Sequence, residues 1–340
     1  MKVAINGFGR IGRQVMRAAV KNDWHHHIVA VNDLTDVETL AHLFKYDSVY
    51  EKFDGEIGFE SGDDVYQGFL LIDGHKIGVL SQKDPAVLPW KDLGVDVVVE
   101  STGFFTDRTK ASAHLTAGAK RVVISAPAKS DDVETFVIGV NEKDLKDQDI
   151  ISNASCTTNC ISPVAKVVDD NFGIEKAMMT TIHAYTADQK LVDAPHKDKR
   201  RGRAAGANIV PTTTGAAIAT TKTIPSLEGK FDGMAIRVPV ICGSLSDFTF
   251  LLKKNVTEEE VNQVLEKAAA GDYKGLIEVT YEPLVSKDII GNEHSAIVNL
   301  DLTKVVDGNM LKLIAWYDNE WGYSNRLFEL VKSMEDKYAN

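Results

Sequence analysis

The chain has 340 residues, of which 44% are hydrophobic and 26% are charged, as is usual for folded globular proteins. Its formal net charge of −11 argues against general affinity for nucleic acid or anionic membranes, so an anionic ligand must be bound by a local basic cluster. Three cysteines give no disulfide framework, and no apolar run approaches the roughly 20 residues that span a bilayer. We therefore expect about two domains of a cytoplasmic protein, with no membrane segment and no dedicated nucleic-acid site.

The N-terminal segment has the pattern of a dinucleotide-binding turn. An apolar strand at residues 2–6 leads into Gly7-Phe8-Gly9-Arg10-Ile11-Gly12, and a helix-patterned segment follows. Such glycines allow a tight turn and let backbone amides approach a pyrophosphate at the positive end of the helix. A second strand at residues 28–32 ends at Asp33, whose carboxylate can accept hydrogen bonds from an adenosine ribose. This order of strand, glycines, helix, strand and acid predicts an NAD site that includes Gly7, Gly9, Gly12 and Asp33.

Two further strands are expected at residues 96–100 and 121–125, because these runs are short, rich in β-branched residues and almost continuously apolar. Thr102 and Ser125 stand where these strands end, which makes them candidate cofactor contacts. Residues 69–77 read as a hairpin around an Asp-Gly turn. The first half of the chain therefore predicts an α/β fold with a Rossmann-type, doubly wound parallel sheet.

A candidate nucleophile follows this first half. Cys156 stands among hydroxyl residues where an apolar-periodic helix begins, and a helix N-terminus favours a thiolate. His183 lies downstream, and a cysteine with a spatially adjacent histidine can attack a carbonyl carbon. The domain boundary is expected near residues 151–156.

The second half predicts an α+β domain with a mixed or antiparallel sheet. Strand-like runs at residues 234–240, 247–252 and 296–300 are separated by few helices. One helix is expected after a capping box at Thr257, and Gly271 would end it.

Several of these motifs, taken together, resemble phosphorylating glyceraldehyde-3-phosphate dehydrogenases over essentially the whole chain. They are residues 6–12, Ser152-Asn153-Ala154-Ser155-Cys156-Thr157-Thr158-Asn159-Cys160, Pro211-Thr212-Thr213-Thr214-Gly215-Ala216-Ala217, Arg237-Val238-Pro239 and Trp316-Tyr317-Asp318-Asn319-Glu320-Trp321-Gly322-Tyr323. The resemblance implies an NAD-binding domain at residues 1–155, on which a C-terminal helix at about 320–340 packs, and a catalytic domain at residues 156–319. It also implies a homotetramer.

The resemblance further implies oxidation of glyceraldehyde 3-phosphate to an acyl phosphate, with reduction of NAD. Cys156 would be the nucleophile and His183 the base, and Asn319 would contact the nicotinamide carboxamide. Arg10 and Ile11 would lie along the pyrophosphate, and Lys83 and Ser125 near the adenosine. Two anions need sites, the substrate phosphate and the attacking inorganic phosphate. Thr186 and Arg237 would hold one of them, and the other would be surrounded by Ser155, Thr157, Thr214, Gly215 and Arg201.

Other readings stay open from the sequence. The related erythrose-4-phosphate dehydrogenases share the cysteine and the histidine but usually lack the Thr-Thr-Gly motif that this chain carries at residues 213–215. A non-catalytic nucleotide-binding protein is a third reading. His25-His26-His27 is expected to be a surface turn, and no metal site is expected. Ala194-Pro195 and residues 240–247, which include Cys242, depart from the common family pattern.

Overall fold

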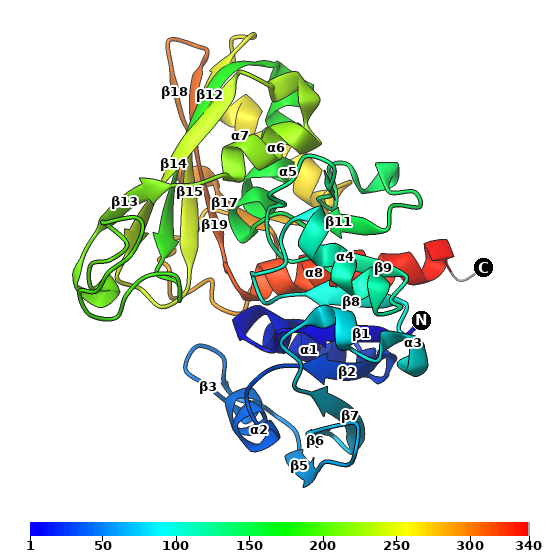
Figure 1. Cartoon of the computed structure of the whole chain (residues 1–340). Helices are drawn as coiled ribbons and strands as arrows, with labels where there is room; N and C mark the ends of the chain where they lie inside the picture. Colours follow the sequence, from blue (N-terminus) through cyan, green and yellow to red (C-terminus); the bar gives the residue numbers. More distant parts are fainter. Residues whose placement is uncertain (339–340) are drawn as a thin grey trace. The chain divides into compact units, whose positions relative to one another are not determined.

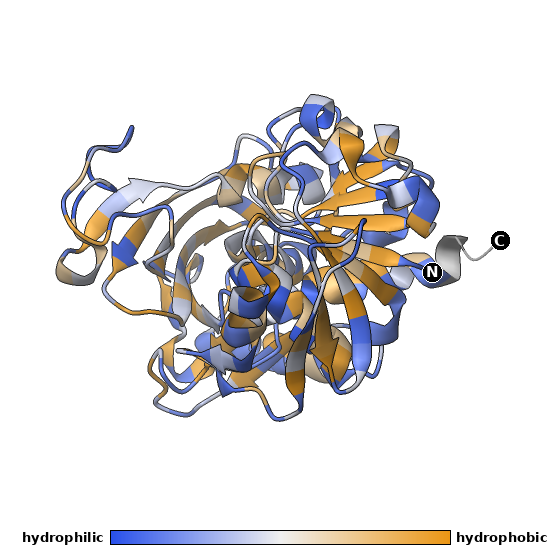
Figure 2. Cartoon of the chain, turned by 60° about the horizontal axis from the view of Figure 1, so that its bottom comes forward, coloured by the Kyte–Doolittle hydropathy of each residue, from blue (hydrophilic) through white to orange (hydrophobic). Residues whose placement is uncertain are grey.

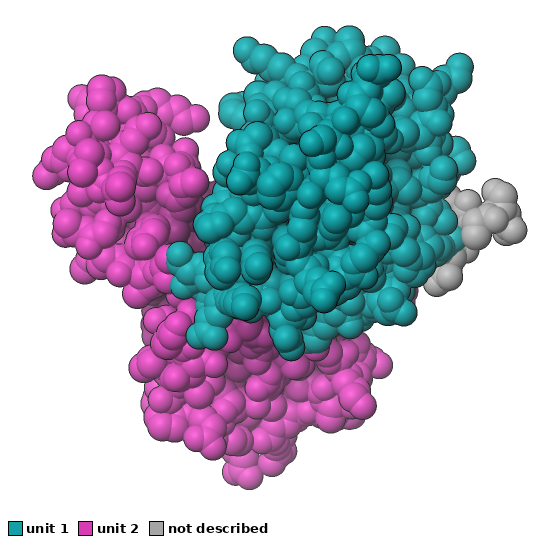
Figure 3. Space-filling view, turned by 90° about the horizontal axis from the view of Figure 1, so that it is seen from below, with its two compact units in different colours: residues 1–136, 144–154, 324–340 teal, residues 137–143, 155–323 magenta. Residues whose placement is uncertain are grey.

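The computed structural model describes residues 1–338, so the last two residues of the predicted C-terminal helix, 339 and 340, lie outside the described residues. The chain forms two compact units, coloured separately in Figure 3. The first comprises residues 1–136, 144–154 and 324–340, and the second comprises residues 137–143 and 155–323. The predicted boundary was 155/156, and residues 137–143 group with the second unit. This division alone does not say what each unit binds, so the functional assignment of the two domains stays a prediction.

The first unit is built on a nine-stranded sheet (Figure 1). Its strands, from one edge to the other, are β10 (Glu134–Thr135), β11 (Ile150–Ser152), β9 (Arg121–Ile124), β8 (Val97–Glu100), β1 (Val3–Asn6), β2 (Ile28–Asn32), β7 (His75–Leu80), β6 (Gly68–Ile72) and β5 (Ile57–Ser61). All pairs from β10 to β7 are parallel, and only β7–β6 and β6–β5 are antiparallel. The predicted Rossmann-type parallel sheet is thus confirmed.

The central strands of this sheet are buried along their whole length. Every residue of β1 and of β8 is buried, because helices in an α/β fold cover both faces of a parallel sheet. Figure 2 shows strands of this sheet as nearly continuous hydrophobic arrows. The helices and 3-10 turns of the unit are α1 (Arg10–Lys21), η1 (His25–His27), α2 (Val37–Lys45), η2 (Pro85–Val87), α3 (Trp90–Leu93) and α4 (Arg108–Thr116), and a two-stranded ribbon is formed by β3 (Tyr46–Asp47) and β4 (Glu51–Lys52).

The predicted hairpin is formed by β6 and β7. Its two turn residues, Asp73 and Gly74, have φ angles of 49° and 80°, as a type I′ turn requires. The last helix, α8 (Trp321–Tyr338), runs from the second unit into the first. Within the first unit, Phe328 of α8 packs edge-on against Trp24, and Glu335 accepts a hydrogen bond from the Trp24 indole at 3.0 Å.

The second unit contains a mixed sheet, as predicted. Its strand order is β13 (Val210–Thr213), β14 (Phe231–Val238), β12 (Ile174–Ala184), β15 (Ser244–Leu252), β19 (Met310–Tyr317), β17 (Ala296–Asn299) and β16 (Ile277–Thr280), and β18 (Lys304–Val306) also pairs with β19. The pairs β14–β12 and β17–β16 are parallel and the others are antiparallel. Strand β15 alternates strictly between buried and partly buried residues, so one face of it packs into the core.

Helix α5 (Cys156–Phe172) packs against this core through Ile161, Val164 and Val168. The predicted capping box begins α7 (Glu258–Ala270), where the Thr257 hydroxyl and the Glu260 carboxylate bind each other's backbone amides. The remaining helix and 3-10 turns of the second unit are α6 (Ala216–Thr223), η4 (Ala205–Ala207), η5 (Pro225–Leu227) and η6 (Leu300–Leu302), and η3 (Glu142–Asp144) lies where the two units divide.

Candidate active site

Cys156 is the first residue of α5, as the sequence predicts. Ser155 is the N-cap of this helix, and its hydroxyl accepts a hydrogen bond from the Thr158 amide at 3.1 Å. Ala154, directly before it, has a φ of 56°, a left-handed conformation that is costly for a residue with a Cβ atom. The chain therefore reaches the N-terminus of α5 through a sharp, strained turn.

The thiol of Cys156 faces the ring of His183, which is the second-last residue of β12. The distance from Sγ to Nε2 is 3.4 Å. On the other side of the ring, Nδ1 lies 2.7 Å from the Ala184 carbonyl oxygen. A carbonyl oxygen has no hydrogen to donate, and this contact is shorter than the 3.1 Å contact of Nδ1 with Arg237 Nη1, so we assign the proton to Nδ1 and leave Nε2 as an acceptor for the thiol. The neutral pair is thus oriented for transfer of the Sγ proton to Nε2.

Arg237 reaches the same histidine because β12 and β14 are parallel and in register. The residue paired with His183 is Arg237 itself. Its Nη1 lies 3.0 Å from the Ala184 carbonyl oxygen, 3.1 Å from His183 Nδ1 and 3.3 Å from the Thr186 hydroxyl. Its buried Nε meets no acceptor among the described residues. Thr186 and Arg237, both expected at one phosphate, are therefore adjacent, and the arginine keeps a donor for a further ligand.

Burial disfavours the charged form of both members of the pair. It raises the pKa of the Cys156 thiol, although the nearby Arg237 charge and Thr157 oppose this. Burial and the Arg237 charge together lower the pKa of His183 to about 3. Desolvation thus opposes the stabilisation of the thiolate that is expected from a helix N-terminus. Near neutral pH we expect the two groups to ionise together, by proton transfer, rather than separately.

Tyr317 also belongs to this site, although no role for it was predicted from the sequence. Its hydroxyl lies 2.9 Å from the Thr157 hydroxyl and 2.8 Å from the Thr181 hydroxyl, and its ring meets the His183 ring edge-on at 5.9 Å. The tyrosine therefore ties α5, β12 and β19 together behind the reacting pair. The sequence carries one signal for this arrangement. Thr181 and His183 are two residues apart on a strand, so their side chains share a face, and Tyr317 contacts both of them.

The residues expected at the second phosphate fall into two groups. Ser155 caps α5, and Gly215 is the N-cap of α6, whose first amide (Ala216) donates to the Thr214 hydroxyl at 3.2 Å. These three residues stand at helix N-termini, which attract anions. The Thr157 hydroxyl, in contrast, is directed to Tyr317.

Arg201 is already bound to protein groups through all three of its nitrogens. Its Nε donates to the Thr212 hydroxyl at 2.9 Å, Nη1 to Asp188 at 2.6 Å and Nη2 to the Thr213 carbonyl at 3.0 Å. Two carboxylates, Asp188 and Asp198, lie within 4 Å of it. A phosphate at Arg201 would have to share the guanidinium with Asp188.

Asn319 follows β19 and is almost entirely buried, with 6% of its surface exposed. Its side-chain oxygen accepts hydrogen bonds from the Gly243 amide at 3.1 Å and from the Ser244 hydroxyl at 2.8 Å. Cys242, which the sequence left without a role, lies beside it and donates its S–H to the Asp318 carboxylate at 3.2 Å.

In the first unit, the turn from β1 to α1 shows why the glycines are needed. Gly7 has a φ of 93°, and a Cβ there would come within 2.7 Å of the Thr102 amide nitrogen. A Cβ on Gly12 would come within 2.2 Å of the Gly7 carbonyl oxygen. Gly9 differs, because its φ is −74° and a Cβ there would meet no atom of the described chain within 4 Å. The space beside Gly9, at a helix N-terminus without a side-chain cap, fits a pyrophosphate.

The neighbouring predicted cofactor residues are also placed at strand ends. Asp33 accepts hydrogen bonds from the Phe8 amide at 2.8 Å and the Thr35 amide at 3.0 Å, so it joins the end of β2 to the glycine turn. Thr102 follows β8 and bonds to the buried Glu100 carboxylate, and Ser125 follows β9. Lys83 is exposed in the loop after β7.

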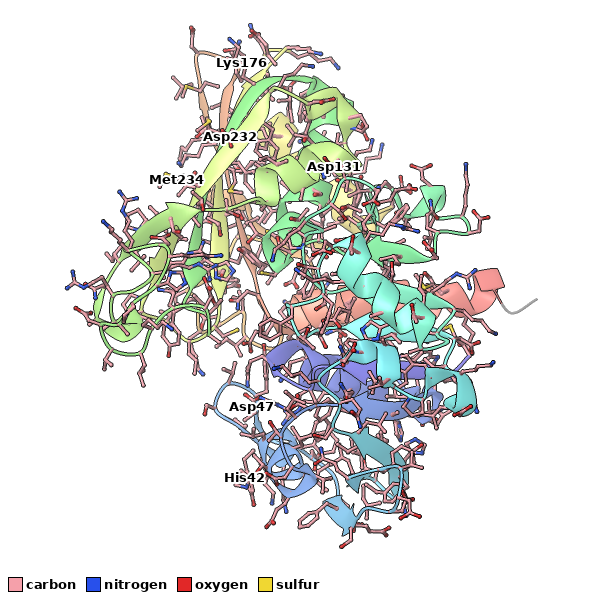
Figure 4. All side chains as sticks on the ribbon, viewed as in Figure 1. His42, Asp47, Asp131, Lys176, Asp232 and Met234 are labelled. Atoms are coloured by element: carbon pink, nitrogen blue, oxygen red, sulfur yellow. The ribbon has the colours of Figure 1, made fainter. Side chains whose placement is uncertain are left out.

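The Arg10 side chain, expected along the pyrophosphate, binds another side chain of the protein. Its guanidinium forms an ion pair with the buried carboxylate of Asp47 at 2.5 Å. Asp47, the second residue of β3, is labelled in Figure 4. Arg10 and Ile11 therefore offer backbone amides of the first helical turn, rather than a guanidinium, to a pyrophosphate.

His25-His26-His27 forms the 3-10 turn η1. Among residues 1–338, no group of three or more histidine, cysteine, aspartate or glutamate side chains is arranged to hold a metal ion.

Family models and individual relatives point to the same family. Residues 1–108 match the model of the glyceraldehyde 3-phosphate dehydrogenase NAD binding domain, and residues 155–319 match that of the C-terminal domain of the same family. The chain is 52% identical over 339 residues to a glyceraldehyde-3-phosphate dehydrogenase of Priestia megaterium, with 99% of each chain covered, and equally similar to glyceraldehyde-3-phosphate dehydrogenase 1 of Bacillus subtilis. It is 53% identical over 338 residues, 99% of each chain, to glyceraldehyde-3-phosphate dehydrogenase 1 of Streptomyces avermitilis. The chain therefore belongs to the NAD-dependent glyceraldehyde-3-phosphate dehydrogenase family.

Proposed function

We propose that the protein catalyses the phosphorylating oxidation of D-glyceraldehyde 3-phosphate to 1,3-bisphosphoglycerate, coupled to the reduction of NAD. The observation that carries this proposal is the 3.4 Å contact of the Cys156 thiol with His183 Nε2, beside an arginine with a spare donor. Two relatives that are 52% identical to this chain are named glyceraldehyde-3-phosphate dehydrogenases.

Cys156 and His183 perform the covalent steps. The Sγ proton moves to Nε2, and the thiolate adds to the aldehyde carbon. The former aldehyde oxygen takes this proton from Nε2, which gives a hemithioacetal and leaves His183 neutral again. Negative charge develops on this oxygen. The backbone amide of Cys156 and the side chain of His183 donate hydrogen bonds to it. NAD, when bound, accepts the hydride from the former aldehyde carbon. Neutral His183 removes the hydroxyl proton as the hydride leaves, which produces a thioester on Cys156.

Phosphate completes the reaction. One of its oxygens attacks the thioester carbon, the bond from this carbon to Sγ breaks, and the proton of the hydrogen phosphate is released to water. The leaving thiolate takes back the proton from His183, so the pair returns to its neutral state. The desolvation that lowers the pKa of His183 suits this cycle, because it favours the neutral ring and so the return of each accepted proton to the oxygen or the leaving thiolate.

Two phosphate sites are part of this proposal. Thr186 and Arg237 hold one anion, and the unpaired, buried Nε of Arg237 supports this role. Ser155, Thr214 and Gly215 surround the other anion at helix N-termini, with the backbone of Thr157 and the guanidinium of Arg201.

For NAD, we propose contacts from the first helical turn and from the ends of the strands. Gly7, Gly9, Arg10, Ile11 and Gly12 hold the pyrophosphate by their backbone. Asp33 binds the adenosine ribose, with Lys83, Thr102 and Ser125 as further contacts, and Asn319 binds the nicotinamide carboxamide. The open space beside Gly9 supports this reading, because nothing in the described protein itself requires a glycine there.

We also infer a homotetramer in the cytoplasm. Large apolar side chains of the second unit are exposed in the single chain, which is typical of surfaces covered by another subunit. They include Leu191, Val192, Ile209, Ile218 and Met234, the last of which is labelled on β14 in Figure 4. All three cysteines are thiols, which suits a reducing compartment. In residues 1–338, no helix combines the length and the apolar character needed to cross a membrane.

The direct test is NADH formation from glyceraldehyde 3-phosphate, followed by absorbance with and without inorganic phosphate. Steady turnover that needs both NAD and phosphate supports the proposal. Turnover at the same rate without phosphate, or turnover with erythrose 4-phosphate but not with glyceraldehyde 3-phosphate, contradicts it.

A further inference from the structure

The side-chain amide of Asn319 has only one possible orientation. The atom of its carboxamide group that lies 3.1 Å from the Gly243 amide nitrogen must be the oxygen, because a backbone N–H can only donate. The same oxygen lies 2.8 Å from the Ser244 hydroxyl. Oδ1 is therefore turned towards residues 243 and 244, and Nδ2 points to the opposite side. No acceptor in the described part of the chain binds the two hydrogens of Nδ2.

The hydroxyl of Ser244 is itself oriented by β12. The Ala184 amide donates to Ser244 Oγ at 3.1 Å, so the hydroxyl hydrogen is directed to Asn319. The carbonyl of Ala184 accepts the Nδ1 proton of His183 at 2.7 Å. The backbone of Ala184 thus orients the imidazole of His183 directly. Through Ser244 it also orients the side-chain amide of Asn319.

The backbone next to Asn319 is held separately. Oδ1 of Asp318 accepts hydrogen bonds from the Glu320 amide at 2.9 Å, the Trp321 amide at 2.8 Å and the Cys242 thiol at 3.2 Å. Oδ2 accepts from the Gly291 amide at 2.8 Å. Asp318 therefore holds the backbone at this point, and Ser244 orients the side chain of Asn319.

We propose that Ser244 is a positioning residue for the cofactor, and that it acts by holding Asn319 so that only its NH2 group is offered to the nicotinamide carboxamide. This inference rests on the proposed contact of Asn319 with that group. A carboxamide ligand has a carbonyl acceptor and an NH2 donor, and a site that offers donors alone binds its carbonyl. The choice fixes which way the ring is turned relative to the hydride donor.

The test compares two ligands and two serines. Ser244→Ala should weaken NAD binding about tenfold, the effect of one hydrogen bond in a buried site, while the affinity for ADP-ribose, which lacks the nicotinamide, stays within about twofold. Ser246 is the matched control, since it is a buried serine on the same strand, two residues along. Ser246→Ala should leave the affinities for both ligands unchanged. Calorimetric titration measures these constants without turnover.

A double-mutant cycle separates positioning from local damage. If Ser244 acts through Asn319, the change Ser244→Ala should have no further effect on NAD binding once Asn319→Ala is present. An equal loss in both backgrounds, or a loss for ADP-ribose as large as that for NAD, would overturn the inference. If Asn319→Ala alone weakens NAD while Ser244→Ala does not, the inference fails and the proposed cofactor contact stands. If Asn319→Ala has no effect on NAD, the cofactor contact itself fails, and the inference fails with it.

Discussion

In the first unit the turn at residues 7–12 is made of consecutive residues and offers backbone groups, whereas in the second unit the residues around Cys156 come from separate elements and offer side chains. Gly7 and Gly12 are required by contacts within the turn and with residue 102. Cys156, His183 and Arg237 meet only because α5, β12 and β14 pack together. A change at Gly9 should therefore affect cofactor binding alone, whereas a change at His183 or Arg237 should affect several properties of the second unit.

The largest effect is expected at the base. His183→Asn removes the acceptor for the Sγ proton, so kcat should fall roughly 10²–10⁴-fold while the affinity for NAD is kept. Alkylation of Cys156 by iodoacetamide at neutral pH should also become slower. Steady-state kinetics and peptide mapping measure both. An unchanged turnover number with unchanged alkylation would remove His183 from the mechanism.

Arg237→Ala should lower kcat/KM for glyceraldehyde 3-phosphate about 10–150-fold, because charge-assisted hydrogen bonds to phosphate are lost. Unphosphorylated glyceraldehyde should lose far less, which controls for damage to the fold. The Arg237 charge also lowers the pKa of His183. Without it this pKa rises, more of the base is protonated in acid, and the acid limb of the pH profile should move to higher pH. Equal losses for both aldehydes would argue against phosphate recognition.

Gly9→Ala tests the first unit. The added methyl group meets no atom of the described chain, so the melting temperature should stay unchanged, while NAD binding should weaken about tenfold or more because the methyl group enters the space assigned to the pyrophosphate. Gly7→Ala is the contrast, since its φ of 93° and the 2.7 Å approach to residue 102 should reduce stability as well. Tight NAD binding by Gly9→Ala would place the pyrophosphate elsewhere.

Asp47→Asn should have the smallest effect. Burial raises the pKa of Asp47, but the Arg10 guanidinium and the amides of Val49 and Tyr50 outweigh it and lower the pKa overall. A carboxyl whose folded-state pKa is lowered stabilises the fold above its unfolded pKa of about 3.9 and loses this contribution as the pH falls further. We expect a loss of about 1 kcal/mol at pH 7 that shrinks towards pH 3, measured by urea unfolding. A loss that is constant with pH would show that the charge of Asp47 is not involved.

Local features of the fold could be predicted from the sequence, and distant pairings could not. The strand at residues 28–32, the Asp73-Gly74 turn and the capping box of α7 depend on neighbouring residues, and all three were predicted. The register that pairs His183 with Arg237 joins residues 54 apart, which no local pattern specifies. The roles of Tyr317 and Ser244 depend on the same long-range pairing of β19, β15 and β12.

Charge compensation was the other feature that the sequence did not reveal. Arg10 and Arg201 were expected beside phosphates, yet their guanidinium groups are paired with Asp47 and Asp188. Each aspartate lies more than ten residues from its arginine, so a motif centred on the arginine does not include it. The burial of His183 and the partial burial of Cys156 are likewise properties of the packed chain.

The most direct test of the account is to capture the covalent intermediate. The enzyme is mixed with NAD and glyceraldehyde 3-phosphate without inorganic phosphate, quenched in acid and digested, and the cysteine peptides are weighed by mass spectrometry. We expect a burst of about one NADH per chain, one acyl group on Cys156, none on Cys160 or Cys242, and loss of the acyl group when phosphate is added before the quench. A burst of NADH without an acylated Cys156, or with the acyl group on another cysteine, would contradict it.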